Sequence, residues 1–297
     1  MKTNVFISSG AFQTHDLDAI LGVCRQRQLK GLELGSRIAF SEDMFSRLKT
    51  FLGAGDTELL IHNYFPPPAE PFVLNLASDD PAVLARSREH CLEALQWCAR
   101  FRVPFYSVHA GFCFHASPED LGGDLTGLPR ILKDKAEAVF VESLKELARA
   151  AAVEGIDILV ENNVLTPSNC VNGANDLMLG VTSDDLLRIL EGAGGSHLGI
   201  LLDVGHLKIS AGSLGFSAEE FIRDLGPYVR AVHMSENNGR QDTHRPVAED
   251  SWFWPFVLEG LPSCEAYVLE ACGLTEDVMV EQEKLIHNKV KECRHCS

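Results

Sequence analysis

The sequence has no apolar run that approaches the ~20 residues needed to span a bilayer. Its first stretch, MKTNVFISSG, lacks the long apolar core of a secretory signal. Cysteine occurs nine times, an odd number, and the cysteines are scattered among apolar segments, which is typical of reduced thiols and argues against a disulfide framework. We therefore expect a cytoplasmic protein that does not enter a membrane.

Basic residues are scarce as well. The 26 Lys and Arg are outnumbered by 42 Asp and Glu, which gives a net charge of −16 at pH 7. Because phosphate backbones and anionic membranes are bound by clustered Lys and Arg, this balance argues against a nucleic-acid partner, although it leaves room for a small basic cleft. The C-terminal CRHC (Cys293, His295, Cys296) lacks the second ligand pair of a zinc finger, so its role stays open.

Eight short apolar runs organise the chain. Hydrophobic residues make up 45% of the sequence, which is enough for a sizeable core. The runs show almost no alternation of apolar and polar residues, and this favours strands buried on both faces, as in a parallel sheet. They are NVFIS (4–8), GLEL (31–34), ELLIHNY (58–64), PFYSVHA (104–110), DILVEN (157–162), LGILLDV (198–204), VRAVHM (229–234) and AYVLEA (266–271).

Segments with helical periodicity follow most of these runs, at 17–28, 41–52, 80–101, 135–155, 183–192, 217–225 and 276–293. The pattern is weakest after the seventh run, where SWFWPF (251–256) interrupts it. Capping residues mark expected helix starts at Ser41, Asp80 and Ser217 and expected ends at Gly31, Gly155 and Gly226.

This alternation predicts a (β/α)₈ TIM barrel, since eight β-then-α units in about 300 residues match its count. An open doubly wound sheet is the alternative, but the sequence contains neither GxGxxG nor GxxxxGKS/T to support it. No linker divides the chain, and its two longest loops follow the fourth and fifth runs (113–130 and 163–180). We predict a single barrel domain over residues 1–297.

Ionisable residues recur at the ends of six runs, on the side of the barrel where such enzymes carry their active sites. A carboxylate directly after an apolar run is costly to bury without a partner or a metal, and ILVEN, LLDVGH and VLEA all place one there. His, Asp and Glu without Cys suit Mn²⁺, Mg²⁺, Co²⁺, Fe²⁺ or Zn²⁺. The candidates are His62, His109, Glu161, Asp203, His206, His233, Asp242, His244 and Glu270.

These motifs resemble those of the xylose isomerase-like barrel superfamily, which includes sugar and sugar phosphate isomerases and epimerases and the endonuclease IV nucleases. The resemblance covers about residues 4–270 and rests on the Glu after the fifth run, DVGH (203–206), HMSENNG with DTH (233–244) and the last Glu. For the epimerase branch it implies one divalent metal held by Glu161, Asp203, His233 and Glu270.

The same branch implies that Glu161 and Glu270 are catalytic. One glutamate would remove a proton from the carbon between two sugar oxygens and the other would return one, while the metal stabilises an enediolate. The resemblance assigns His206 and Arg240 to substrate oxygens, and we expect Trp252 to offer an aromatic wall to a sugar ring.

The endonuclease IV branch is the alternative, because all nine ligand positions of its three-metal site have a matching residue here. His62, His109, His206, Asp242 and His244 would then hold additional metals, or else contact substrate. The charge of −16 weighs against a DNA substrate, and RPVAEDSWFW after DTH lacks the glycine-rich continuation of both branches. We therefore predict a divalent-metal-dependent isomerase or epimerase of a small carbohydrate-like molecule, with a multinuclear phosphoesterase as the alternative and self-association left open.

Overall fold

Eight parallel strands form the centre of the molecule. The computed structural model describes residues 4–35 and 37–294, and in this part of the chain each strand pairs with the next while the last pairs with the first, which closes a barrel. The predicted (β/α)₈ class is confirmed. The strands are β1 (Val5–Ser8), β2 (Gly31–Leu34), β3 (Glu58–His62), β4 (Phe105–His109), β5 (Asp157–Glu161), β6 (Leu198–Asp203), β7 (Val229–Met234) and β8 (Ala266–Leu269).

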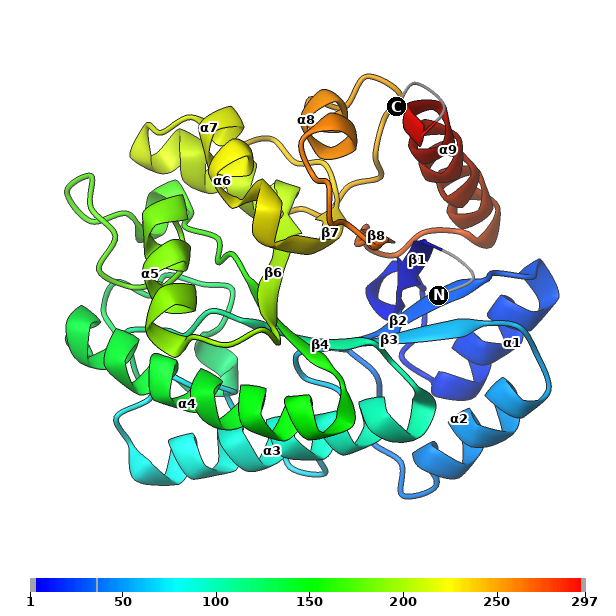
Figure 1. Cartoon of the computed structure of the whole chain (residues 1–297), viewed down its shortest axis with the longest axis horizontal. Helices are drawn as coiled ribbons and strands as arrows, with labels where there is room; N and C mark the ends of the chain where they lie inside the picture. The colour runs from blue at the N-terminus through cyan, green and yellow to red at the C-terminus, as the bar shows by residue number, and fades with distance from the viewer. Residues whose placement is uncertain (1–3, 36, 295–297) are drawn as a thin grey trace.

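Helices surround this barrel as an outer layer (Figure 1). The two long helices α3 and α4 pack side by side along one flank, and α9 packs against β1 and α1 near the start of the chain. The α-helices of the described residues are α1 (Leu17–Arg27), α2 (Met44–Gly53), α3 (Pro81–Phe101), α4 (Lys133–Glu154), α5 (Ser183–Ala193), α6 (Val204–Leu214), α7 (Ala218–Leu225), α8 (Trp254–Glu259) and α9 (Glu276–Arg294).

The starts of the helices follow the predicted caps in two cases of three. The side chains of Asp80 and Ser217 accept backbone N–H groups in the first turns of α3 and α7, as predicted. The prediction at Ser41 is wrong, because α2 begins at Met44 and its N-cap residue is Asp43. The Ser41 hydroxyl donates to the Asp43 carboxylate instead of capping the helix.

The glycine predictions at the helix ends are right at one position. Gly155 ends α4 with a left-handed φ of 68°. Gly31 does not cap α1, because the helix ends at Arg27 with Gln28 as its C-cap residue at a φ of 58°, and Gly31 begins β2. A Cβ atom on Gly31 would lie 2.3 Å from the Val5 carbonyl oxygen, so strand packing explains this glycine. Gly226 has a helical φ of −46° and is not a left-handed cap either.

The connection from β6 to β7 holds two helices, of which only α7 was predicted. The helix α6 follows Asp203 without a loop, and the Asp203 carboxylate accepts the His206 backbone N–H at 2.6 Å. Several faces of α6 are buried, so its sequence VGHLKISAGSL shows little of the polar and apolar periodicity that identifies a surface helix. Because α6 begins directly at the end of β6, His206 lies in its first turn, close to Asp203.

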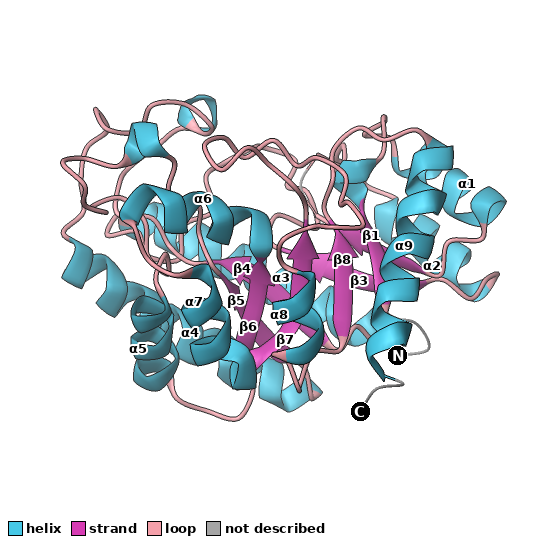
Figure 2. Ribbon diagram, turned by 90° about the horizontal axis from the view of Figure 1, so that it is seen from above, coloured by secondary structure: helices cyan, strands magenta, loops and turns pink. Residues whose placement is uncertain are grey.

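The loops after the strands gather at one end of the barrel, above the arrowheads in Figure 2. The long loops after β4 and β5 pair with each other, since the Cys113 N–H donates to the Leu177 carbonyl and the Leu179 N–H donates to the Gly111 carbonyl. The same two connections supply a second apolar cluster, separate from the main core, made of Phe114, Leu125, Leu165, Leu177, Met178 and Val181. The long loops therefore pack against each other through a small core of their own.

No helix in residues 4–35 and 37–294 has the length and apolar character of a membrane span. The single-domain assignment of residues 1–297, the cytoplasmic location and self-association stay predictions. His295 and Cys296 of the CRHC tail, and the side chain of Cys293, lie outside the described residues.

Candidate metal centre

All nine predicted ligand residues converge at the ends of β3 to β8. Their side-chain nitrogen and oxygen atoms fall into four overlapping groups, in each of which the atoms lie within 4.8 Å of one another. The groups are His62, Glu161 and His233; His109, Glu161 and His206; His206, Asp242 and His244; and Glu161, Asp203, His233 and Glu270. We call these nine residues the metal centre.

The strand register explains this convergence. His109 pairs directly with Glu161 across β4 and β5, and Asp203 pairs with His233 across β6 and β7. Directly paired residues of neighbouring strands point to the same side of the sheet, so each pair directs both side chains into the barrel mouth. Glu270 follows β8 by one residue and completes the ring.

The innermost group surrounds the imidazole of His233. Its Nδ1 atom lies 3.1 Å from Glu270 Oε2, 3.6 Å from Glu161 Oε1 and 4.0 Å from Asp203 Oδ2. The side chains of Glu161 and Asp203 are almost completely buried, while that of Glu270 is 21% exposed. Three carboxylates and one imidazole thus face one small volume that opens on the Glu270 side.

Several buried atoms of this group have no hydrogen-bond partner among the described residues. They are both carboxylate oxygens of Glu161, Asp203 Oδ2, Glu270 Oε2 and His233 Nδ1. A buried carboxylate oxygen without a partner is strongly unfavourable, and a cation at the point the atoms share would satisfy all of them at once. Oxygen and imidazole donors in this combination fit a divalent metal ion.

A second, imidazole-rich group lies beside the first. The carboxylate of Asp242 is 3.2 Å from His206 Nε2 and 2.9 Å from His244 Nε2. His109 Nδ1 lies 3.4 Å from Glu161 Oε2, and the side chain of His109 is 28% exposed. Glu161 therefore belongs to both groups and connects the buried part of the centre with its more open part.

Three imidazoles are anchored through Nδ1 and direct Nε2 at a carboxylate of the centre. His62 Nδ1 bonds to the Ser107 hydroxyl at 2.9 Å, His206 Nδ1 donates to the Asn162 carbonyl at 2.9 Å, and His244 Nδ1 donates to the Glu270 carbonyl at 3.0 Å. An outer bond of this kind fixes the ring orientation and leaves the other nitrogen for a metal, which is the usual arrangement of metal-binding histidines.

The carboxylates of the centre raise the pKa values of neighbouring imidazoles. Burial opposes protonation of His233, but the carboxylates of Glu270 and Glu33 outweigh it and hold the pKa of His233 well above its usual range. Burial likewise opposes protonation of His244, yet its hydrogen bond to Asp242 raises the pKa of His244 to about 10. Without a metal, protons on the imidazoles balance part of the negative charge.

The carboxylates respond to burial in opposite ways. Burial would raise the pKa of Glu161, but the surrounding imidazoles of His109 and His62 overcome it and lower the pKa to about 2. Burial raises the pKa of Asp203 to about 8, and the neighbouring carboxylate of Glu270 adds to this shift. Two carboxylates of the innermost group therefore differ at neutral pH in the absence of a metal, because Glu161 is ionised whereas Asp203 is largely protonated.

The DVGH motif is built around Gly205. A Cβ atom at this position would lie 2.6 Å from Ser235 Oγ and 3.2 Å from Asp203 Oδ1, so any side chain would displace the centre. Asn162 fixes the same turn, because its side chain donates to the Asp203 carbonyl and accepts the Asp203 N–H. The motif therefore positions Asp203 and His206 as one unit.

Sequence reasoning missed Glu33. This carboxylate lies in β2, is 1% exposed, and places Oε2 3.1 Å from His233 Nε2. The signal was present in GLEL, where a carboxylate interrupts an apolar run. The difference lies in the structure, where Glu33 is inside β2 whereas Glu161 and Asp203 end β5 and β6.

Two predicted substrate contacts stand apart from the centre. Arg240 is exposed, and its described hydrogen bond is the one its backbone N–H donates to Asn238. Trp252 packs against the rings of Phe253 and Phe256, and its indole N–H has no partner among the described residues. Neither side chain makes a hydrogen bond or ion pair with the nine residues in the described part of the chain, so both roles stay predictions.

The fold and the motifs agree with the comparison to known families. A family model described as a xylose isomerase-like TIM barrel matches residues 21–262, and the chain belongs to this family. The resemblance inferred from the sequence is thereby confirmed.

Proteins of similar sequence and of similar structure are both found. The chain is 27% identical to an uncharacterized protein of Methanocaldococcus jannaschii over 45% of its own length, and it spans 53%, about half, of that relative. It is 25% identical to a probable endonuclease 4 of Aquifex aeolicus over 74% of its length and 68% of that protein. Among solved structures, a D-tagatose 3-epimerase-like protein superposes with a TM-score of 0.74 at 20% identity, covering 99% of both chains.

Proposed function

We propose that the protein is a divalent-metal-dependent isomerase or epimerase of a sugar, a sugar phosphate or a similar polyol. The observation that carries this proposal is the set of buried atoms of Glu161, Asp203, His233 and Glu270 that make no hydrogen bond among the described residues and face one volume that opens on the Glu270 side. Membership of the xylose isomerase-like family and the likeness to an epimerase-like structure support the same class of reaction.

Four residues would hold the metal: Glu161, Asp203, His233 and Glu270. The bound ion would supply an electrophile that stabilises negative charge on adjacent substrate oxygens. The low pKa of Glu161, about 2, keeps this carboxylate ionised at neutral pH, as a proton acceptor must be. Glu161 Oε1 and Glu270 Oε2 lie 3.6 and 3.1 Å from the same atom, His233 Nδ1, which supports a pair of glutamates of which one would remove a proton from carbon and the other would return one.

Exchange of solvent deuterium into a panel of ketoses tests this proposal. We expect the metal-loaded protein to incorporate deuterium at a carbon next to the carbonyl of its substrate. Glu161→Gln should lower the exchange rate by at least about 100-fold, the contribution typical of a general base. Glu265→Gln is the control. It makes the same change at the residue that precedes β8, at the opposite end of this strand from Glu270, and should retain the rate. Full exchange activity in Glu161→Gln would contradict the role of Glu161.

A multinuclear phosphoesterase is the second candidate, and the group of His109, His206, Asp242 and His244 favours it. These side chains offer ligands for additional metals beside the innermost group, and a probable endonuclease 4 is among the relatives. Metal analysis separates the two candidates, because one equivalent of metal per chain supports the epimerase whereas two or three equivalents support the phosphoesterase. Cleavage of an oligonucleotide with an abasic site tests the second candidate directly.

The charge of the centre connects metal number with substrate charge. Five buried or half-buried carboxylates gather here: Glu33, Glu161, Asp203, Asp242 and Glu270. One divalent cation would leave negative charge in excess when the imidazoles are neutral, which disfavours an anionic substrate. Three divalent cations would reverse the sign and attract a phosphate group. A one-metal protein should therefore prefer an uncharged sugar over its phosphate.

A further inference from the structure

Among the described residues, the ion pair that links the buried carboxylate of Glu33 to the metal centre is the one with His233. Glu33 comes from β2, a neighbour of β3 in the barrel that supplies none of the nine residues, and 200 positions separate it from His233. Its Oε2 atom lies 3.1 Å from His233 Nε2, and its Oε1 atom has no partner among the described residues. The charged contact of this carboxylate among the described residues is therefore the one with the His233 imidazole.

This contact differs from the outer bonds of the other imidazoles. His62, His206 and His244 are anchored through Nδ1 to a hydroxyl or a carbonyl oxygen. His233 is anchored through Nε2 to a carboxylate, and its Nδ1 atom faces the carboxylates of the innermost group. The ring is therefore turned around relative to its neighbours, and its outer partner is charged.

An ionised carboxylate only accepts hydrogen bonds, so the shared proton of this pair resides on His233 Nε2. Nδ1, the atom 3.1 Å from Glu270 Oε2, would then be the nitrogen that gives up its proton when a metal binds and offers its lone pair as the ligand. A carboxylate behind a metal-binding imidazole fixes the tautomer, holds the ring plane and raises the basicity of the ligating nitrogen.

Packing alone does not explain a charge at this position. The residues paired with Glu33 across the neighbouring strands, Ser8 of β1 and Leu60 of β3, share its face of the sheet, are buried and carry no charge, so an uncharged side chain would suit this environment. Burial of a carboxylate costs free energy that a single imidazole contact offsets only in part. We infer that Glu33 is a positioning residue that presents His233 Nδ1 to a divalent cation; this inference rests on the metal centre of the proposed function.

Calorimetric titration of the metal-free protein with Mn²⁺ measures the effect. Glu33→Gln keeps the shape of the side chain and removes its charge, and we expect its Mn²⁺ affinity to fall about 10- to 100-fold. Glu33→Asp keeps the charge at a shorter reach and should show an intermediate loss, which also covers the case in which Glu33→Gln does not fold. Glu265→Gln is the matched control and should bind Mn²⁺ as the unchanged protein does. Equal affinity in a folded Glu33 variant overturns the inference.

A spectroscopic readout separates positioning from a general structural role. In the zinc-loaded protein, the ¹⁵N spectrum should show His233 protonated at Nε2, with the attached proton strongly downfield because it is bonded to a carboxylate. Glu33→Gln should move this proton upfield and leave the signals of His206 and His244 in place. An unmoved His233 signal would count against the role of Glu33.

The outcomes also distinguish this inference from the proposed function. Metal binding that weakens in the Glu33 variants, in a protein that exchanges no deuterium into any sugar, supports the role of Glu33 and contradicts the isomerase. Metal binding that is unchanged by the variants, in an active isomerase, contradicts only the role of Glu33. A protein that binds no divalent metal overturns both.

Discussion

At the scale of single residues, the end of a buried parallel strand decides which side chains meet. Glu161 closes β5 and Asp203 closes β6, and each was identifiable because a carboxylate follows an apolar run. Glu33 escaped the same reasoning because it lies inside β2, and sequence gives no register that shows which interior residues face the barrel axis. Which nitrogen of His233 faces the centre was also beyond the sequence, since it depends on a partner 200 positions away.

His90 gives the protein a pH-dependent stability that is independent of the metal centre. This residue of α3 packs against the rings of Tyr64 and Phe72, and burial lowers its pKa to about 4. An unfolded chain binds the proton near pH 6.5, so the stabilising contribution is complete above that pH and is lost as the pH falls toward 4.

His90→Gln removes this titration, and urea unfolding at several pH values measures it. Between pH 7 and pH 4 the unchanged protein should lose about 3 kcal/mol more unfolding free energy than His90→Gln. The carboxylates titrate in both proteins, so the difference isolates His90. Parallel pH profiles of the two proteins would show that His90 has no such effect.

At the scale of elements, β6 continues directly into α6, and this junction positions Asp203 and His206 in the centre. The helix α6 starts on Asp203 and was not predicted, because a helix buried on several faces lacks the periodicity that marks a surface helix. The helices α3 and α7 were recognisable from capping side chains, whereas α2 starts later than its sequence indicated. Local signals thus find helices that face solvent better than those that face the site.

Two glycines of α6 offer a matched pair of substitutions. Gly205→Ala should weaken Mn²⁺ binding by about tenfold or more, because its Cβ atom would press on Ser235 and Asp203. Gly212→Ala should keep the affinity, since its Cβ atom would meet only the Gly239 carbonyl oxygen at 3.7 Å. The second substitution should also raise the unfolding free energy by roughly 0.5–1 kcal/mol, the gain of Ala over Gly inside a helix. Calorimetry and urea unfolding of both variants check these outcomes.

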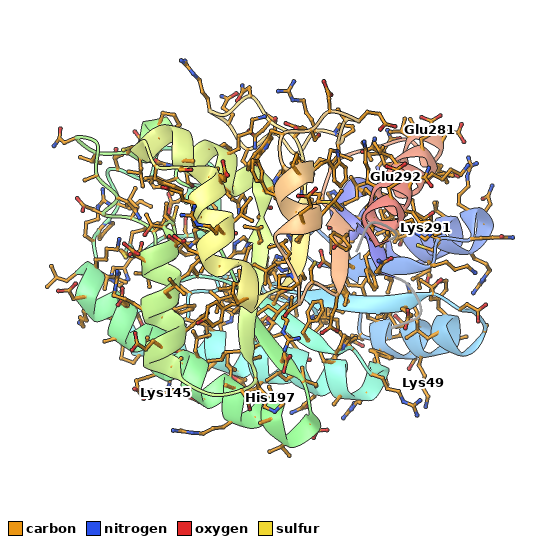
Figure 3. The ribbon with its side chains drawn as sticks, turned by 45° about the horizontal axis from the view of Figure 1, so that its top comes forward. Lys49, Lys145, His197, Glu281, Lys291 and Glu292 are labelled. Carbon is orange, nitrogen blue, oxygen red and sulfur yellow. The ribbon has the colours of Figure 1, made fainter. Side chains whose placement is uncertain are left out.

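At the scale of the whole molecule, the eight-strand count predicted the barrel because strands buried on both faces leave unmistakable apolar runs. The surface is less informative. In Figure 3 the side chains of Lys49, Lys145 and Lys291 project from three different helices, so these cations do not share one patch. With a net charge of −16, this dispersal accords with a small-molecule substrate more than with a DNA duplex.

Removal of the metal should destabilise the whole barrel. A ligand at 100 times its Kd stabilises the folded state by about 2.7 kcal/mol, which for a chain of this size corresponds to a Tm change of roughly 4 °C. A chelator should therefore lower the Tm, and added Mn²⁺ should restore it. In Asp203→Asn, which weakens one ligand, the chelator should change the Tm less. A Tm that stays the same when the chelator is added would contradict a bound metal.

The pairing of Glu33 with His233 also bears on the order of events in folding. These residues are 200 positions apart, and the remaining members of the centre come from six successive strands. Contacts of such long range form late, because a large loop must be closed before they can be made. A metal ion would thus find its complete site only after the last strand has closed the barrel. Bound metal would slow the unfolding of the folded protein and leave its folding rate almost unchanged.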